Sequence, residues 1–187
     1  MVNPIDYYAK SKWQSERAIQ YLNHAPTILR FGTLFGISPR LRFDLVVNVF
    51  IIQALFEGKI TVNGGEQYRP FLSLNDVTNV YKFILYKDKK LGSFICNLVS
   101  FNLKIKTLAQ KILKIINNKN TRIIFNPQNK DKRNYIVGSK NFDKIFGKNF
   151  KFSSFKTEVK YLFKQMKANK IKLNSSTIRM KYYKKIL

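Results

Sequence analysis

The sequence has few of the residues that build metal sites and disulfides. Among its 187 residues are one cysteine, Cys96, and one histidine, His24. A single cysteine excludes an internal disulfide framework and suits a reducing, cytoplasmic environment. Because no second cysteine or histidine is available to complete a ligand set, we expect no metal site. Cys96 lies in the apolar run 93–98, which predicts a packed thiol in a buried strand rather than a nucleophile.

Long hydrophobic runs are also missing. No stretch contains the roughly 18 apolar residues that a membrane-spanning helix requires, and the apolar stretch 45–56 is interrupted by Asn48 and Gln53. The N-terminus contains Asp6 and a tyrosine pair, which is not the pattern of a signal peptide. We therefore expect a cytoplasmic chain that is long enough for one modest core.

Acidic side chains are scarce: 10 Asp and Glu oppose 35 Lys and Arg, for a net charge of +25. Residues 1–80 hold 8 basic and 6 acidic side chains, whereas residues 81–187 hold 27 and 4. Such asymmetry is typical of chains that bind nucleic acid or anionic membranes. The last part, 168–187, has six basic side chains and no acidic one, which predicts a solvated basic tail.

Compositional drift explains the same charge without a partner. Lysine outnumbers arginine 27 to 8, and Lys, Asn, Ile, Phe and Tyr, which AT-rich codons favour, make up 91 residues. The lysines recur on several predicted elements with no visible stripe. We favour drift and do not expect a nucleic-acid partner. Two alternatives stay open: a basic module that binds nucleic acid or an anionic surface without catalysis, and a non-functional remnant.

The most informative segment lies near the N-terminus, where Tyr8 and Lys12 are four residues apart in a predicted helix, 7–23. Residues at that spacing share one helix face. A lysine ammonium beside a phenol favours the phenolate form, and such a phenol can act as a general base on a sugar hydroxyl. The spacing alone arises by chance in lysine-rich helices, so the flanking motifs decide the interpretation.

Those motifs resemble the extended short-chain dehydrogenases, which are NAD-dependent nucleotide-sugar epimerases and dehydratases. The first, Asn3-Pro4, then Tyr8-Ala9-Lys10-Ser11-Lys12 and Glu16, is similar to the family's active-site helix, with Ala9 in place of the usual glycine. Three further blocks follow in family order: 28–36 with 38–40, 60–65 leading to 67–71 and 76–77, and 131–135. Together they cover about residues 3 to 165.

The resemblance implies the catalytic residues and the cofactor. Tyr8 would be the acid and base of the reaction, and Lys12 would assist it and contact the nicotinamide ribose of NAD. Phe31 would pass near the nicotinamide. Tyr8, Lys12 and Phe31 are therefore the expected cofactor contacts of this chain.

The resemblance also implies a nucleotide-sugar site. Thr33 stands where many relatives carry an asparagine that holds the substrate phosphate, and Asn48 would hydrogen-bond the nucleotide or serve as a helix cap or core amide. Arg69 and Arg133 would clamp the substrate pyrophosphate, because a guanidinium fork binds phosphate oxygens in pairs. Surface arginines are the alternative for both. Arg40 and Arg42 would touch substrate or solvate their loop, and Asp76 is expected to cap a helix rather than to catalyse.

One family feature is not found. None of the eight glycines forms the Gly-x-Gly-x-x-Gly or Gly-x-x-Gly-x-x-Gly turn that seats the pyrophosphate of NAD on a helix N-terminus. We interpret the chain as the C-terminal part of such an enzyme. NAD is expected for the full-length family, and the expected partners are a nucleotide sugar, an N-terminal Rossmann half if the gene is split, and a second copy in a homodimer.

The expected fold is α/β: the trailing part of a Rossmann-type parallel sheet plus a small α/β substrate-binding domain. By the resemblance, residues 1–36 and 75–92 belong to the sheet, 37–74 and 93–167 to the substrate side, and 168–187 to the tail. Without its N-terminal half, that sheet would present an unpaired edge. Sequence patterns predict helices over 7–23, 43–56, 75–86, 105–116, 140–146 and 154–166, and strands over 27–31, 59–63, 94–98 and 121–125.

Overall fold

The computed structural model describes residues 4, 6–22, 26–39, 41–86, 91–128, 133–147 and 150–168. His24, Arg40 and residues 169–187 of the predicted tail lie outside this description. In chain order, the elements are α1 (Tyr7–Gln20), β1 (Thr27–Phe31), β2 (Thr33–Phe35), α2 (Val46–Ile52), the π-helix η1 (Gln53–Glu57), β3 (Lys59–Asn63), β4 (Tyr68–Ser73), α3 (Leu74–Tyr86), β5 (Phe94–Leu98), β6 (Phe101–Lys104), α4 (Ile105–Ile116), β7 (Arg122–Asn126), α5 (Lys140–Phe146) and α6 (Phe155–Lys167).

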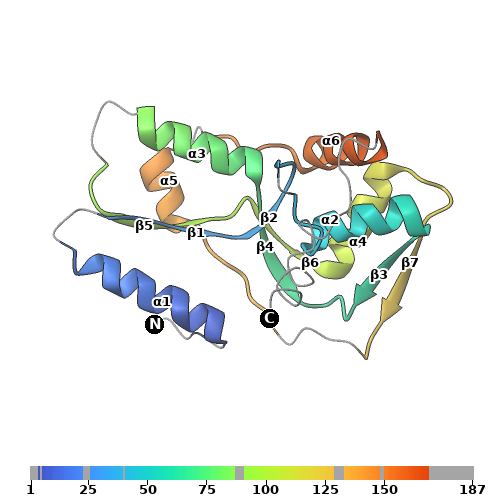
Figure 1. Ribbon diagram of the computed structural model, residues 1–187, viewed down its shortest axis with the longest axis horizontal. Helices are drawn as coiled ribbons and strands as arrows, with labels where there is room; N and C mark the ends of the chain where they lie inside the picture. The colour runs from blue at the N-terminus through green and yellow to red at the C-terminus, as the bar shows by residue number, and fades with distance from the viewer. Residues whose placement is uncertain are drawn as a thin grey trace.

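The strands form three small sheets, and most of their pairings are parallel. β1 pairs with β5, β2 with β4, and β3 with β7, all in parallel, whereas β4 and β6 are antiparallel. In Figure 1 the β1–β5 sheet lies between α1 on one side and α3 and α5 on the other, while α2, α4 and α6 gather at the opposite end with β3 and β7. Helices on both faces of a parallel pair make this an α/β fold, as the sequence predicted.

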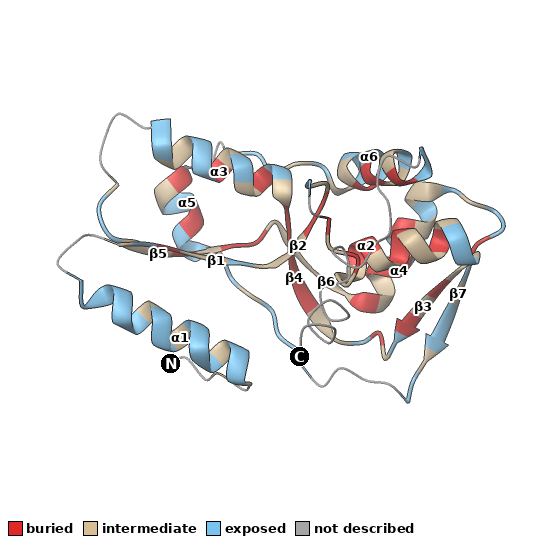
Figure 2. Cartoon of the chain, in the orientation of Figure 1, coloured by how far each residue is buried: buried red, intermediate tan, exposed pale blue. Residues whose placement is uncertain are grey.

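Two hydrophobic clusters hold the molecule together. The larger lies among α2, α4, α6, β3 and β4, where the buried faces appear red in Figure 2. α4 buries Ile105, Leu108, Ala109 and Ile112, the spacing of one helix face. The smaller cluster joins β5, α3 and α5 and contains Leu72, Val80, Cys96, Leu98, Phe142 and Phe146. Complete burial of one such side chain is worth about 1.5–3 kcal/mol, so each cluster is a substantial source of stability.

The junction between β1 and β2 is where the two clusters meet. Gly32 separates the two strands, and its amide donates to the carbonyl of Leu98 at 3.0 Å. A Cβ at Gly32 would lie only 3.1 Å from the carbonyl carbon of Pro70, so a side chain there would force β2 away from β4. Glycine therefore permits the close approach that brings β1, β2 and β4 together.

Most predicted elements are confirmed, and the differences have physical causes. The helix expected over 43–56 begins at Val46 and widens into η1 before Gly58 ends it. Of the predicted strand β1, only Ile28 is buried, because β1 pairs with a single strand among the described residues. Cys96 is buried as predicted, and burial raises the pKa of its thiol.

The described helices are too short or too polar to span a bilayer.

Candidate functional site

An open cleft of about 1110 Å³ is lined by side chains from α1, β1, β2, α2, β3 and β4. Six of the seven side chains that the sequence assigned to the site line it: Tyr8, Phe31, Thr33, Asn48, Arg69 and Arg133. The fold thus gathers residues from distant parts of the chain around one space. Their chemical roles remain predictions.

Tyr8 reaches the cleft from the first turn of α1. Asp6 begins this helix, because its Oδ1 accepts a hydrogen bond from the amide of Ala9 at 2.7 Å. The Tyr8 side chain is 72% exposed, so its phenol is open to solvent and to a ligand. The Nζ of Lys12, the one assigned residue outside the lining, lies 5.6 Å from the centre of the Tyr8 ring, as their spacing on one helix face predicted.

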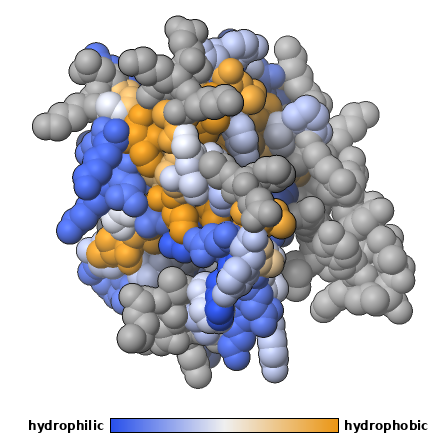
Figure 3. Space-filling model, turned by 90° about the vertical axis from the view of Figure 1, so that its left-hand side faces the viewer, coloured by the Kyte–Doolittle hydropathy of each residue, from blue (hydrophilic) through white to orange (hydrophobic). Residues whose placement is uncertain are grey.

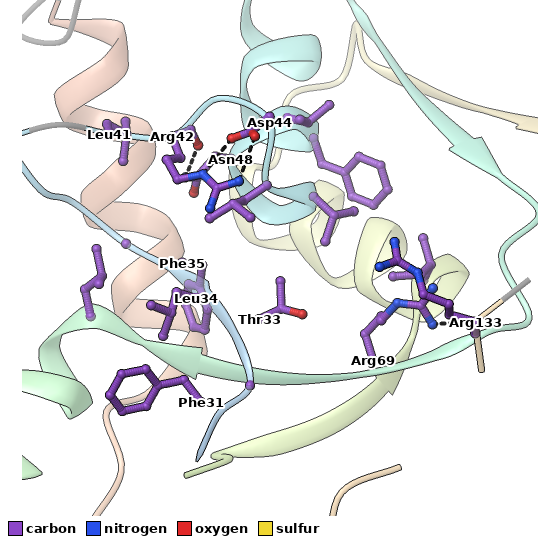
Figure 4. Close-up of a pocket in the computed structure, with 18 of the residues that line it drawn as sticks. Phe31, Thr33, Leu34, Phe35, Leu41, Arg42, Asp44, Asn48, Arg69 and Arg133 are labelled. Carbon is purple, nitrogen blue, oxygen red and sulfur yellow. Dashed lines mark hydrogen bonds and ion pairs between the residues drawn. The ribbon is translucent and has the colours of Figure 1, made fainter. Parts of the chain in front are cut away.

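Phe31 and Thr33 form one wall of the cleft at the β1–β2 junction. Phe31 packs edge-on against Tyr81 of α3, with ring centres 6.5 Å apart. Thr33 pairs with Phe71 of β4, and in Figure 4 its side chain lies between Phe31 and the two arginines, Arg69 and Arg133. An aromatic ring and a hydroxyl therefore both line the cleft at this junction.

Arg69 and Arg133 lie side by side on the other side of Thr33 (Figure 4). Arg69 is only 7% exposed, and its Nη1 donates to the carbonyls of Tyr68, at 2.6 Å, and of Arg133. Its guanidinium also lies 5.2 Å from the centre of the Tyr135 ring. Arg69 therefore fixes the backbone that carries Arg133, while the Arg133 guanidinium is about half exposed.

The segment 133–139 has no regular secondary structure, and asparagine side chains hold it in place. Asn102 of β6 donates to the carbonyl of Val137 at 3.1 Å and accepts from its amide at 3.0 Å. Asn134 accepts from the amide of Tyr68 at 2.9 Å, and Asn97 donates to the carbonyl of Gly138 at 3.0 Å. These bonds substitute for a strand ladder and give Arg133 a defined place at the cleft.

Asn48 is a buried amide with one unsatisfied atom. The residue is 1% exposed, and its Nδ2 donates to the carbonyl of Arg42 at 2.7 Å. Among the described residues, none donates a hydrogen bond to its Oδ1. A buried carbonyl left without a donor costs about 1–3 kcal/mol. Asn48 therefore acts as a core amide that shapes the Arg42 loop, and its oxygen is a candidate acceptor for a ligand donor.

The charges that line the cleft are mainly positive. Arg42, Arg69 and Arg133 belong to the lining, together with one carboxylate, Asp44. Asp44 accepts two hydrogen bonds from Arg42, at 2.9 and 2.7 Å, drawn as dashed lines in Figure 4. The cleft therefore suits an anionic ligand, and phosphate is the group that arginine forks hold best.

Asp76 does not cap α3, as the sequence had predicted it would. Ser73 caps α3, because its Oγ accepts from the amide of Asp76 at 3.0 Å. The Asp76 carboxylate is fully buried and accepts from the amide of Ser153 at 2.7 Å and from Oγ of Ser100 at 3.1 Å. The prediction was wrong because these two partners are distant in sequence. Asp76 instead ties α3 to the segments that follow β5 and precede α6.

Sequence reasoning missed a polar wall of the cleft formed by Gln53, Thr61, Asn63 and Gln67. Oε1 of Gln53 accepts from the amide of Thr61 at 3.0 Å, which ties η1 to β3. Gln53 was visible as a polar residue within an apolar stretch, and that interruption is the signal that could have identified it. Tyr135, whose ring lies near the Arg69 guanidinium, was missed although it belongs to the motif block 131–135, because Arg133 alone was assigned a role in that block.

No family model matches this sequence. Solved structures do match in fold. A dTDP-glucose 4,6-dehydratase from Bacillus anthracis in complex with NAD has a TM-score of 0.72 at 14% identity, covering 91% of this chain. A UDP-glucuronic acid 4-epimerase from Bacillus cereus in complex with UDP-glucuronic acid and NAD has a TM-score of 0.72 at 19% identity, covering 90%. A UDP-N-acetylglucosamine 4-epimerase from Methanobrevibacter ruminantium has a TM-score of 0.70 at 19% identity, covering 89%.

This chain spans about 55% of the length of each of these three proteins. The fold is therefore that of NAD-dependent nucleotide-sugar dehydratases and epimerases over a part of their chain. The fold that the sequence motifs implied is confirmed. What these proteins bind and catalyse does not follow from fold alone.

Proposed function

We propose that this chain forms the substrate side of the active site of an NAD-dependent nucleotide-sugar epimerase or dehydratase. The observation that carries the proposal is that one cleft is lined by Tyr8, Phe31 and Thr33 together with Arg69 and Arg133. A group that can exchange a proton and groups that can hold a diphosphate thus line the same cleft. This combination suits a substrate with a sugar at one end and a nucleoside diphosphate at the other.

The residues of this chain have distinct tasks in this proposal. Tyr8 accepts a proton from, or returns it to, a sugar hydroxyl or carbon, and the neighbouring ammonium of Lys12 stabilises the phenolate. Arg133 holds the diphosphate, and Arg69, besides lining the cleft, fixes the position of Arg133. Thr33 and Asn48 offer a hydroxyl and an amide oxygen that can orient the nucleotide sugar.

The residues present fit only one end of NAD. Tyr8, Lys12 and Phe31 would contact its nicotinamide end, and the cofactor, when bound, supplies hydride transfer. The glycine-rich turn that seats its pyrophosphate is not part of this sequence. We therefore propose that another polypeptide segment, either continuous with this one or a separate chain, supplies the dinucleotide-binding half.

The open edge of β1 is the proposed docking place for that half. Among the described residues β1 pairs only with β5, so its other edge can accept a further parallel strand. Apolar side chains on both sides of the sheet are exposed, including Ile19 next to the end of α1, Phe31 on β1 and Leu85 on α3. Figure 3 shows hydrophobic side chains among hydrophilic ones on this end of the molecule. A homodimer through the same surface is the competing outcome.

Calorimetric titration with a panel of UDP-, dTDP- and GDP-sugars tests the substrate side without NAD. We expect at least one nucleotide sugar to bind, and Arg133→Gln to weaken its binding about 10-fold or more, since charge-assisted hydrogen bonds are worth about 1.5–3 kcal/mol. Arg122→Gln is the matched control, because Arg122 is exposed on β7 and lies outside the cleft. Equal losses in both variants would mean that general charge, not the cleft, attracts the nucleotide.

A second candidate function is a basic surface that binds a polyanion, and α6 favours it. Lys156, Lys160, Lys164 and Lys167 are all exposed and recur about once per turn. Around a small hollow of about 360 Å³, Lys114 of α4 joins Lys156 and Lys160. Sequence reasoning found no lysine stripe, whereas these four exposed lysines of α6 form one. The helix places on one face lysines that the sequence merely scatters among apolar residues.

A further inference from the structure

Asp6 makes two contacts, one through each of its carboxylate oxygens. Oδ1 accepts from the amide of Ala9 at 2.7 Å and begins α1. Oδ2 lies 3.9 Å from Nη1 of Arg133, the cleft arginine. The same side chain therefore touches both the helix that carries Tyr8 and the group proposed to hold a diphosphate.

This contact matters because α1 has few other attachments. None of its fourteen residues is buried. In its second half, Glu16 pairs with Arg30 of β1 through a two-pronged bond with a shortest distance of 2.5 Å. Among the described residues, two acid–arginine pairs thus hold α1, one near each end. Of these two pairs, the one at the N-terminal end involves a residue of the cleft.

We infer that Asp6 is a resident counter-ion of Arg133, and that an entering diphosphate competes with it for this guanidinium. The inference rests on the proposed function, since it assigns Arg133 to an anionic ligand. Asp6 is two residues from Tyr8, so occupation of the anion site and the position of the acid/base helix are coupled. Asp6 is thereby a positioning residue, which acts on the ligand through Arg133.

The sign of the effect follows from charge. A carboxylate next to Arg133 repels phosphate oxygens and partly neutralises the charge of the guanidinium. Removal of this carboxylate should therefore strengthen diphosphate binding. Both partners are about half exposed, and exposed pairs are worth little. The expected gain is therefore small, roughly two- to five-fold in Kd.

Asp6→Asn separates the two tasks of Asp6. Asparagine is as good an N-cap as aspartate, so the cap on Ala9 persists while the charge disappears. Asp6→Ser is a second capping variant, which keeps the test valid if Asp6→Asn folds poorly. Glu16→Gln is the matched control, because it removes the other acid–arginine pair of α1 without touching the cleft.

The probes are inorganic pyrophosphate and UDP, titrated calorimetrically into the full chain. Asp6→Asn and Asp6→Ser should bind pyrophosphate roughly two- to five-fold more tightly than the wild type, while Glu16→Gln should match the wild type. In an Arg133→Gln background, Asp6→Asn should bring no gain, since the pair it releases no longer exists. An equal gain in that background, or unchanged or weaker binding by both Asp6 variants, overturns the inference.

UDP distinguishes this inference from the proposed function. If pyrophosphate shows the expected pattern and UDP binds no more tightly than pyrophosphate, the counter-ion role of Asp6 stands and the nucleotide-sugar proposal fails. If the wild type binds UDP well and the Asp6 variants bind it equally, the proposed function stands and the counter-ion role is overturned. If neither probe binds to the wild type or to the variants, the anion site itself is refuted, and Asp6 has no competitor.

Discussion

Tyr8 is exposed, lines the cleft and shares a helix face with Lys12. These features allow a phenol to exchange a proton with a bound sugar, but they contribute little to holding it. Arg69 and Arg133 line the same cleft and suit the binding of an anionic group rather than proton transfer. Rate and affinity should therefore be separable by substitution at these positions.

The first residue-scale prediction concerns Tyr8. Once the dinucleotide-binding half is supplied, by fusion or as a second chain, Tyr8→Phe should lower turnover of the accepted nucleotide sugar about 10²- to 10⁴-fold. Its Kd should change little, because proton transfer is felt in the transition state. Lys12→Met should reduce both turnover and NAD affinity. Steady-state kinetics with direct binding measurements checks this, and wild-type turnover by Tyr8→Phe would show that α1 is only structural.

Glu158 leads to a second prediction at this scale, about pH. Burial raises the pKa of its carboxyl; a hydrogen bond from Asn75 opposes the shift, and the charge of Asp76 adds to it. The folded state thus binds this proton at higher pH than the unfolded chain does. The stability that Glu158 contributes is present at low pH and is lost as pH rises from the unfolded pKa, about 4.3, through the raised folded pKa.

Glu158→Gln should remove that loss. Its melting temperature should therefore rise relative to the wild type as the pH of the melts increases across this window. Glu57→Gln is the control, because Glu57 lies in an exposed pair with Lys59 at 4.0 Å. A Glu158→Gln variant that melts in parallel with the wild type at every pH would mean that the Glu158 carboxylate is not destabilised by its surroundings.

What the sequence predicts at the residue scale depends on spacing. Tyr8 and Lys12 could be placed together because one helix turn separates them, and Arg69 and Arg133 could be assigned because both lie in motifs. The Asp6–Arg133 contact and the buried tether at Asp76 could not be predicted, since both join residues far apart in sequence. Such contacts follow from the packing of elements, which no local pattern encodes.

At the scale of elements, amphipathic helices and β-branched strands were predictable and the central strands were not. α4 and β3 have clear apolar periodicities, and their predicted bounds match the structure. β4 contains Arg69 and Pro70, which argue against a strand, yet it pairs with β2 and β6. It is a strand because Gly32 lets β2 approach it and because Phe71 and Leu72 are buried.

Among the described residues, most acidic side chains lie beside a basic one. Asp6, Glu16, Asp44 and Glu57 each lie within 4.0 Å of an arginine or lysine nitrogen. Hydrogen bonds from Lys104 and Lys106 lower the pKa of Glu66 to about 2. These carboxylates are therefore neutralised locally, and much of the excess charge lies on exposed lysines such as those of α6.

Binding to a random DNA duplex tests whether the excess positive charge was selected for binding or arose by compositional drift. If the charge results from drift, every exposed lysine contributes alike to duplex binding. The α6 triple variant, Lys156→Gln, Lys160→Gln and Lys164→Gln, should then weaken binding no more than a control triple variant. The control carries Lys82→Gln, Lys140→Gln and Lys144→Gln. Binding should be weak and should fall steeply between about 50 mM and about 200 mM salt, because counterion release alone drives it. Fluorescence anisotropy across a salt series measures both effects. A loss confined to the α6 triple variant, with binding that survives physiological salt, would instead establish α6 as a polyanion-binding surface, since stacking and geometry then add to charge.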